Sequence, residues 1–217
     1  MSLVVLCDFD GTIVSIDTCV HILQKFANAD WRKFDEQFED GEITLEECLE
    51  RQFSTVLASR SRILEETEKV ALIRPGFEKL LDYCKTHSLR LVIVSAGLDF
   101  VIKHVLKQHG WNSSIQIYAP KAKCTRKGIV FTFPKPFNAT SVNFKDDLVK
   151  HCKKEGRRVV YVGDGSADYQ AARDADLSIA IKGSRLAELL RKNGIPHIEM
   201  EDFQELSKVI DAFSLSG

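Results

Sequence analysis

The chain begins with a short apolar run that ends directly in two carboxylates. Residues 3–7 read Leu-Val-Val-Leu-Cys, and Asp8, Phe9, Asp10 and Gly11 follow at once. A short apolar run followed by two carboxylates and a glycine predicts a buried strand that ends in a polar site. Side chains two residues apart in an extended segment point the same way, so Asp8 and Asp10 are expected to face one pocket. Because two close carboxylates repel each other, the pattern predicts a metal ion, a shared proton, or both.

Two later apolar runs also end in polar groups. Residues 90–94 lead into Ser95, and residues 159–162 lead into a segment that contains Asp164 and Asp168. In open α/β sheets, ligands bind outside the carboxyl ends of the strands. These polar groups are therefore expected to converge on one crevice with the two carboxylates of the first strand.

The remaining pattern alternates strands with helices, which predicts an α/β fold: a Rossmann-like, doubly wound parallel sheet with right-handed crossovers. From about residue 17 to 70 only helical periodicity is present, which indicates a small helical unit inserted after the first strand. We therefore expect a core of residues 1–14 and 75–217 and a helical insert of residues 15–74. A final helix is expected from about residue 201 to 213.

The composition of the 217-residue chain is that of an ordinary globular protein, and its formal net charge is −1. This charge argues against a nucleic-acid or membrane-surface partner. No apolar run approaches the roughly 20 residues needed to cross a membrane. With no secretion signal, we expect a cytoplasmic protein whose cysteines are reduced thiols rather than a disulfide framework. We expect it to be a monomer or a homodimer. The six cysteines are Cys7, Cys19, Cys48, Cys84, Cys124 and Cys152.

Taken in order, four segments resemble the motifs of the haloacid dehalogenase superfamily of phosphotransferases. They are Asp8–Thr12, Ser95, Lys145 and Gly163–Asp168. Each motif alone is weak, but all four stand in sequence at a strand end or a helix start. The resemblance covers residues 8–168 and implies a core of the haloacid dehalogenase type with a small cap.

The resemblance also implies a role for each motif residue in phosphoryl transfer. Asp8 would be the nucleophile that forms an aspartyl-phosphate, and Asp10 would protonate the leaving group and then activate water. Dehalogenases of the superfamily lack this second aspartate, so Asp10 favours a phosphatase. Ser95 would bind a phosphoryl oxygen with help from the amides of Ala96 and Gly97.

The remaining motif residues would balance charge. Lys145 would stabilise the negative charge around Asp8 and the phosphoryl group. Asp8 and Asp164, with the backbone carbonyl of Asp10, would hold Mg²⁺, which prefers oxygen ligands. Asp168 would fix the surroundings of this metal site.

Simpler explanations stay open for several of these residues. Asp164 and Asp168 are also suited to capping the turn in which they lie. Ser95 is compatible with an ordinary helix N-cap. Lys145 has competitors for its role, namely Lys121, Lys123, Lys127, Lys135 and Lys150.

Two residues of the insert resemble substrate-binding positions of related capped phosphatases. Phosphoserine phosphatases carry a Glu seven residues after the second motif aspartate. This chain has an aspartate, Asp17, at that position, and so does the methionine-salvage phosphatase that acts on 2-hydroxy-3-keto-5-methylthiopentenyl-1-phosphate. Arg51 matches a cap arginine that anchors substrate. A helix cap for Asp17 and an exposed charge for Arg51 are the alternatives. Five aromatic residues are expected in the core of the insert rather than in a thioether pocket: Phe26, Trp31, Phe34, Phe38 and Phe53.

We therefore expect a Mg²⁺-dependent phosphatase acting on a small phosphorylated metabolite, of the methionine-salvage type rather than a phosphoserine phosphatase. The alternative of another class is a regulatory protein that holds phosphate or a metabolite without turnover. The complete set of motif residues argues against that alternative.

Overall fold

The core of the molecule is a six-stranded parallel sheet, seen in a computed structural model that describes residues 2–111 and 113–215. The strand order is β3-β2-β1-β6-β7-β8, and every neighbouring pair is parallel. The predicted doubly wound parallel sheet is confirmed. The strands are β1 (Leu3–Cys7), β2 (Arg90–Val94), β3 (Gln116–Tyr118), β6 (Arg158–Gly163), β7 (Leu177–Ile181) and β8 (Ile198–Met200).

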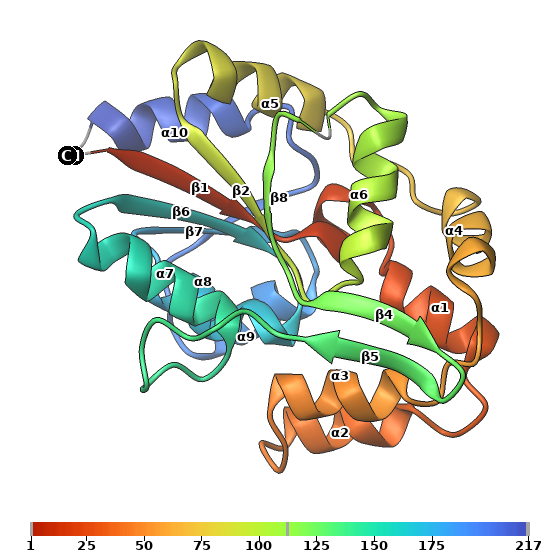
Figure 1. The fold of residues 1–217 in the computed structure, drawn as a ribbon. Coiled ribbons are helices and arrows are strands. Elements are labelled where there is room, and N and C mark those ends of the chain that lie inside the picture. The colour runs from red at the N-terminus through yellow and green to blue at the C-terminus, as the bar shows by residue number, and fades with distance from the viewer. Residues whose placement is uncertain (1, 112, 216–217) are drawn as a thin grey trace.

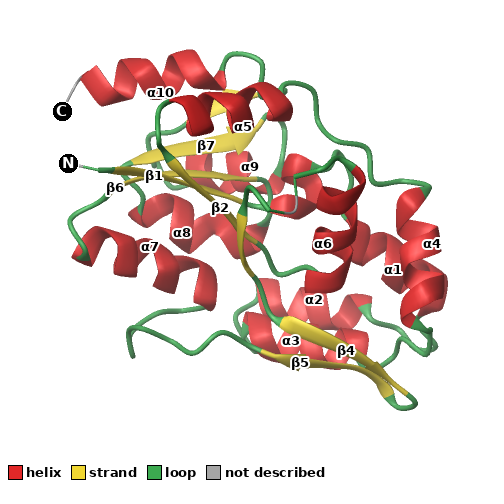
Figure 2. Ribbon diagram, turned by 45° about the horizontal axis from the view of Figure 1, so that its top comes forward, coloured by secondary structure: helices red, strands yellow, loops and turns green. Residues whose placement is uncertain are grey.

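Helices cover both faces of this sheet (Figures 1 and 2). Alternate side chains of a strand point to opposite faces, and β1 shows this clearly. Val5 and Cys7 pack with one group of helices, whereas Val4 and Leu6 pack with the other. The first group is α5 (Phe77–Thr86), α6 (Asp99–Gln108) and α10 (Leu206–Leu215), and the second is α7 (Phe144–Lys154), α8 (Tyr169–Asp174) and α9 (Arg185–Lys192).

The order of the strands reverses between β1 and β6, which are adjacent in the sheet. From β1 the chain passes to β2 and β3 on one side, and only after β3 does it return to place β6 on the other side of β1. Such a reversal leaves a crevice at the carboxyl ends of the two strands. Asp8 directly follows β1 and Asp164 directly follows β6, so the topology places both carboxylates at this crevice.

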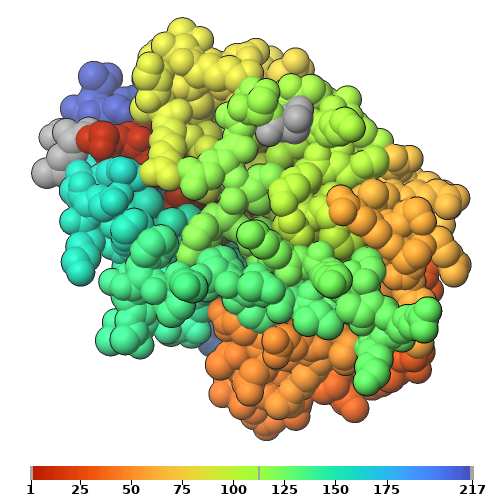
Figure 3. Space-filling view, in the orientation of Figure 1, coloured from red at the N-terminus to blue at the C-terminus, as the bar shows by residue number. Residues whose placement is uncertain are grey.

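The insert after β1 is helical, as predicted. It comprises α1 (Thr18–Phe26), α2 (Arg32–Glu39), α3 (Leu45–Phe53) and α4 (Arg60–Glu68). A hairpin of β4 (Lys121–Thr125) and β5 (Gly128–Thr132) lies against α3, as the orange and green surfaces in Figure 3 show. Phe53 of α3 meets Phe131 of β5 edge to face, with ring centroids 5.5 Å apart. The insert and the hairpin therefore share one apolar core.

The last helix begins later than the sequence pattern predicts. α10 starts at Leu206, not near residue 201, because the preceding segment forms turns that dock on the start of α5. The Phe203 amide donates to the carbonyl of Pro75, and the Phe203 ring contacts Phe77 edge to face. In residues 2–111 and 113–215, no helix combines the length and apolar character required for a membrane crossing.

Asp147 of α7 organises the loop that precedes this helix. Its buried carboxylate accepts hydrogen bonds from the Phe137 and Asn138 amides, each at 2.8 Å, and from the Ser141 hydroxyl at 2.9 Å. Burial alone would raise the pKa of Asp147, but these donors outweigh it and hold the pKa below its ordinary value. The carboxylate form therefore stabilises the fold.

Asp147→Asn is expected to lower the free energy of unfolding at pH 7 by about 2 kcal/mol, because hydrogen bonds to a charged acceptor are lost. Since the folded pKa of Asp147 is lowered, its stabilisation is complete above the unfolded pKa of about 4 and disappears as the pH falls through the folded pKa. Urea unfolding between pH 3 and 7 measures this, and the gap between wild type and variant should narrow towards pH 3. A gap independent of pH would contradict the charge-based explanation.

Candidate active site

The chain turns sharply after β1, and this turn presents Asp8. The carboxylate of Asp8 accepts a hydrogen bond from the Phe9 amide at 2.8 Å and caps the wide turn η1 (Phe9–Ile13). Gly11 in this turn has φ = +70°, and a Cβ there would lie 2.2 Å from the carboxylate of Asp164. Only glycine adopts this conformation freely and leaves room for the second carboxylate. The glycine thus allows the turn after β1 to lie against the carboxylate of Asp164.

Lys145 is the cation at the centre of the site, and it is almost fully buried. Its Nζ lies 3.1 Å from Asp8 Oδ2 and 2.6 Å from Asp168 Oδ1. Burial opposes the charge on Lys145, but the two carboxylates more than compensate and raise its pKa above the ordinary value. Lys145 reaches this position because Asn143 caps α7, accepting from the amides of Lys145 and Asp146.

Asp168 is committed to holding this network together. One carboxylate oxygen accepts from Lys145 Nζ and, at 2.6 Å, from the Tyr161 hydroxyl. The other accepts from the amides of Asp164 and Gly165 at 3.1 and 2.9 Å. Burial alone would raise the pKa of Asp168, but Lys145 and these hydrogen bonds lower it. Asp168 is therefore an anion whose oxygens are already occupied.

The other two carboxylates of the cluster, Asp8 and Asp164, are less fully compensated than Asp168. Oxygens of Asp8, Asp164 and Asp168 all lie within 4.8 Å of one another. Burial and the charge of Asp168 raise the pKa of Asp8 well above its ordinary value and that of Asp164 to about 7. Thr12 is the side-chain partner of Asp164, and its hydroxyl donates at 2.8 Å. Two close, under-neutralised oxygen donors fit a hard divalent cation such as Mg²⁺.

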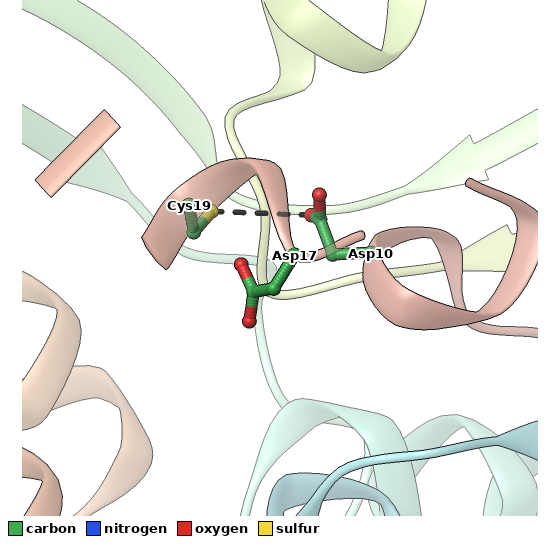
Figure 4. Close-up of side chains that lie close together, drawn as sticks. All are labelled: Asp10, Asp17 and Cys19. Carbon is green, nitrogen blue, oxygen red and sulfur yellow. Dashed lines mark hydrogen bonds between the residues drawn. The ribbon is translucent and has the colours of Figure 1, made fainter. Parts of the chain in front are cut away.

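Asp10 lies at the entrance to the insert, where it meets the start of α1 (Figure 4). Its Oδ1 accepts from the Thr18 amide at 2.9 Å and from the Thr18 hydroxyl at 2.5 Å. The Cys19 thiol points at the other oxygen from 3.9 Å. Burial and the nearby charge of Asp17 raise the pKa of Asp10 to about 7. A carboxyl group with this pKa is suited to proton transfer near neutral pH.

Ser95 and Gly97 lie in the loop after β2 and form another side of the site. Ser95 is buried, and its hydroxyl oxygen accepts from the Gly97 amide at 3.0 Å. A Cβ on Gly97 would lie 2.3 Å from Asp10 Oδ2, so glycine allows this loop to approach the carboxylate. The loop leads into α6, whose N-terminus favours bound anions.

One cavity of about 170 Å³ joins these groups, which is small for a ligand site. The core contributes Asp8, Asp10, Ser95, Ala96, Gly97, Lys145, Asp164, Gly165, Ser166, Ala167 and Asp168. The insert contributes Asp17, Cys19, Val20, Leu23, Asp35, Phe38, Leu45, Cys48, Leu49 and Gln52. Among these lining residues, Lys145 is the sole Lys, Arg or His. The structure thus brings together every predicted site residue except Arg51.

Arg51, which the sequence predicts to anchor substrate, does not line the cavity in this structure. Its side chain is exposed and reaches Gln37 on the outside of α2 at 3.5 Å, whereas Gln52 lines the cavity. Successive residues on a helix are rotated by about 100°, so a shift of one position changes the face that a side chain occupies. The side-chain amide of Gln52 donates to Asp35 at 2.7 Å.

Two other residues of the insert that the sequence singles out, Asp17 and Phe38, both line the cavity. Asp17 lines the cavity and also caps α1, accepting from the Val20 amide at 2.8 Å, so the helix cap is observed and substrate binding stays a prediction. Phe38 packs on the core of the insert, as expected, and lines the cavity as well. Trp31 and Phe53 are buried in the core as expected.

Sequence patterns missed several side chains of the site. Thr12 and Tyr161 bind Asp164 and Asp168, and Asp35 and Gln52 line the cavity. Tyr161 carries a polar hydroxyl group within the apolar run of residues 159–162, and a buried hydroxyl group needs a hydrogen-bond partner. No comparable signal marks Asp35 or Gln52, because polar residues are common on helices of any insert.

Comparison with known proteins identifies relatives over most of the chain. Residues 5–173 match the family model described as haloacid dehalogenase-like hydrolase. A 2-hydroxy-3-keto-5-methylthiopentenyl-1-phosphate phosphatase of Bacillus pumilus is 29% identical, covering 96% of this chain and 90% of its own. An enzyme of the same name from Brevibacillus brevis is 28% identical, with coverages of 96% and 95%.

Among solved structures, a phospho-aspartyl intermediate analogue of phosphoserine phosphatase has the same fold, with a TM-score of 0.70. It is 20% identical in sequence, and the match covers 96% of this chain and 98% of that one. Phosphatases of this type generally use a metal ion. The predicted enzyme class, a phosphatase of this superfamily, is confirmed by these matches. With more than half of its length matched by the family model, the chain belongs to the haloacid dehalogenase-like hydrolases.

Proposed function

We propose that the protein is a Mg²⁺-dependent phosphatase that hydrolyses a small phosphorylated metabolite through an aspartyl-phosphate on Asp8. The observation that carries this proposal is the cluster of Asp8, Asp164 and Asp168 around the buried Lys145, at the carboxyl ends of the strands. The small volume of the adjoining cavity supports a metabolite rather than a phosphoprotein as substrate.

In this proposal Asp8 attacks the phosphorus atom, and the bond between phosphorus and the leaving oxygen breaks. The leaving oxygen takes a proton from the carboxyl group of Asp10, whose raised pKa keeps that proton available near neutral pH. The oxygen of a water molecule then attacks the phosphorus atom while one of its protons passes to the Asp10 carboxylate, and the bond between phosphorus and the Asp8 oxygen breaks. Inorganic phosphate leaves, and both aspartates return to their starting states.

Other groups of the site balance the charge during these steps. Lys145 and the hydroxyl of Ser95, with the amides of Ala96 and Gly97, bind phosphoryl oxygens in the proposal. Asp8, Asp164 and the carbonyl of Asp10 would hold Mg²⁺, which would neutralise negative charge on the phosphoryl group. Asp168, whose oxygens are already occupied, orients Lys145 instead.

For the substrate, we propose a phosphate ester with an uncharged tail, of the methionine-salvage type carried by the names of the relatives. The insert lines the cavity with Val20, Leu23, Phe38, Leu45 and Leu49, and the described lining offers no cation beyond Lys145. Phosphoserine carries a carboxylate, which needs a cationic or amide partner when buried. Asp17, Asp35 and Gln52 are suited to accepting hydrogen bonds from hydroxyl groups of a neutral tail.

Substrate preference tests this assignment. We expect kcat/KM to favour 2-hydroxy-3-keto-5-methylthiopentenyl-1-phosphate over phosphoserine by at least about 100-fold, since an unpaired buried carboxylate costs several kcal/mol. Gln52→Arg introduces a cation into the cavity and should narrow this ratio. Arg51→Gln removes a neighbouring charge outside the cavity and should leave the ratio unchanged. Equal or better turnover of phosphoserine by the wild type would refute the substrate proposal.

We also propose a division into a core of residues 1–14 and 75–217 and a cap of residues 15–74. Hairpin β4–β5 supports the cap, because its Ile129 and Phe131 belong to the apolar cluster of the cap helices. We propose that the protein is cytoplasmic, in keeping with its six free cysteines, and that it is a monomer or a homodimer.

A further inference from the structure

Arg74 lies where the insert rejoins the core, and its guanidinium group binds three backbone carbonyls. Nε donates to Thr12 at 2.9 Å, Nη2 to Gly11 at 2.6 Å, and Nη1 to Glu201 at 3.1 Å. These carbonyls come from two segments that are far apart in sequence, the turn after β1 and the turns before α10. The side chain is half-buried, so water competes only in part for these carbonyls.

The two residues that Arg74 holds after β1 are those that contact Asp164. Thr12 donates its hydroxyl to Asp164 Oδ1 at 2.8 Å. The backbone of Gly11 lies so close to Asp164 that a Cβ would meet its carboxylate at 2.2 Å. The side chain of Asp164 therefore lies against a segment whose own carbonyls accept hydrogen bonds from Arg74.

Arg74 is also part of the connection between insert and core. The two chain segments that link them pair as an antiparallel bridge between Val14 and Ile73. The amide of Ser15 donates to Leu72 O at 2.9 Å, and the amide of Arg74 donates to Ile13 O at 2.8 Å. Any movement of the insert about these segments thus reaches the guanidinium group directly.

We infer that Arg74 is a positioning residue, which fixes Gly11 and Thr12 so that Asp164 is held in the geometry for binding a divalent cation. The inference rests on the proposed function, in which Asp164 is a metal ligand. A planar fork with several donors is needed to bind three carbonyls at once, and the single ammonium of lysine cannot span them in the same way. Arg74 does not touch the reacting atoms.

Calorimetric titration of the full-length protein with MgCl₂ alone tests this inference. We expect Arg74→Lys and Arg74→Met to bind Mg²⁺ about tenfold more weakly, at the lower end of the effect of residues behind metal ligands. The Mg²⁺ concentration at half-maximal activity should rise by the same factor, while kcat at saturating Mg²⁺ stays within about twofold. Guanidinium ion at millimolar concentration, but not NaCl, should partly restore Mg²⁺ affinity in Arg74→Ala.

Arg158→Met is the matched control. Arg158 also donates to a backbone carbonyl, that of Phe213 at 3.0 Å, but from the start of β6, at the opposite end of this strand from Asp164. The Arg158→Met substitution is expected to lower the melting temperature without changing Mg²⁺ affinity. Thr12→Val should weaken Mg²⁺ binding too, and combining it with Arg74→Met should give less than the product of the two effects, because both act on Asp164.

Two outcomes would overturn the inference and are distinguishable. If Asp164→Asn abolishes Mg²⁺ binding but a folded Arg74→Lys binds Mg²⁺ as tightly as the wild type, Arg74 has no positioning role and the proposed function stands. If Asp164→Asn binds Mg²⁺ as tightly as the wild type, the proposed metal site is wrong and the inference falls with it.

Discussion

Asp8→Asn is expected to lower kcat for phosphate release by at least about 10⁴-fold. The amide is a poor nucleophile, and losing the nucleophile of a catalytic unit has effects of this order. Mg²⁺-dependent release of phosphate from p-nitrophenyl phosphate measures the loss. Acid quenching of the wild type should in addition trap phosphate bound to the protein, and the variant should trap none.

The loss of activity in Asp8→Asn is not expected to come from unfolding. Asp8 is nearly fully buried, and burial and the charge of Asp168 raise its pKa, so replacing it with a neutral group of the same shape relieves repulsion. The melting temperature of Asp8→Asn is therefore expected to equal or exceed that of the wild type. Phosphate release at the wild-type rate in a folded Asp8→Asn protein would refute the assignment of the nucleophile. It would also revive the alternative of a binding protein without turnover.

Lys145→Met is expected to affect both stability and catalysis. The variant keeps the length of the side chain but leaves Asp8 and Asp168 without their cation at 3.1 and 2.6 Å. Removing one partner of a buried ion pair lowers the free energy of unfolding by about 3–5 kcal/mol. Losing a preorganised positive group beside the phosphoryl site should lower kcat by about 10²- to 10³-fold. Urea unfolding and steady-state kinetics measure the two effects.

Lys153→Met is the matched control for this prediction. Lys153 lies on the same helix and pairs with Asp176 at 2.9 Å, but both side chains are substantially exposed. Exposed pairs contribute about 0–1 kcal/mol, so the control should change stability by no more than this and leave kcat unaltered. If Lys145→Met were as mild as Lys153→Met in both measurements, one of the competing lysines would have to fill the catalytic role.

The part of the site that lies on the sheet could be predicted because the sequence patterns that mark it are local. Asp8, Ser95 and Asp164 each follow an apolar strand, and parallel strands place such residues at one edge. Lys145 could be chosen from several lysines because it stands at a helix start. Asn143, the cap of that helix, is what aims it at Asp8.

The part of the site on the insert could not be predicted to the same accuracy. Whether Arg51 or Gln52 faces the cavity depends on the rotation of α3 against its neighbours, which periodicity leaves uncertain by a residue. The contact of the hairpin with α3 is equally hidden, since it joins Phe53 and Phe131 across 78 positions of sequence. Both depend on tertiary packing rather than on local pattern.

The carboxylates stand at the ends of the sheet strands, whereas the apolar wall of the cavity is carried by the cap helices, whose apolar cluster also takes in Phe100 of α6 and Phe144 of α7. Mutations that reshape the wall need not disturb the groups that break the phosphate bond. Substrate range can therefore drift through substitutions on α3 while the chemistry is conserved, whereas the start of α1 is tied to Asp10 through Thr18. This modular arrangement gives a lineage of such enzymes an accessible evolutionary route from one metabolite to another.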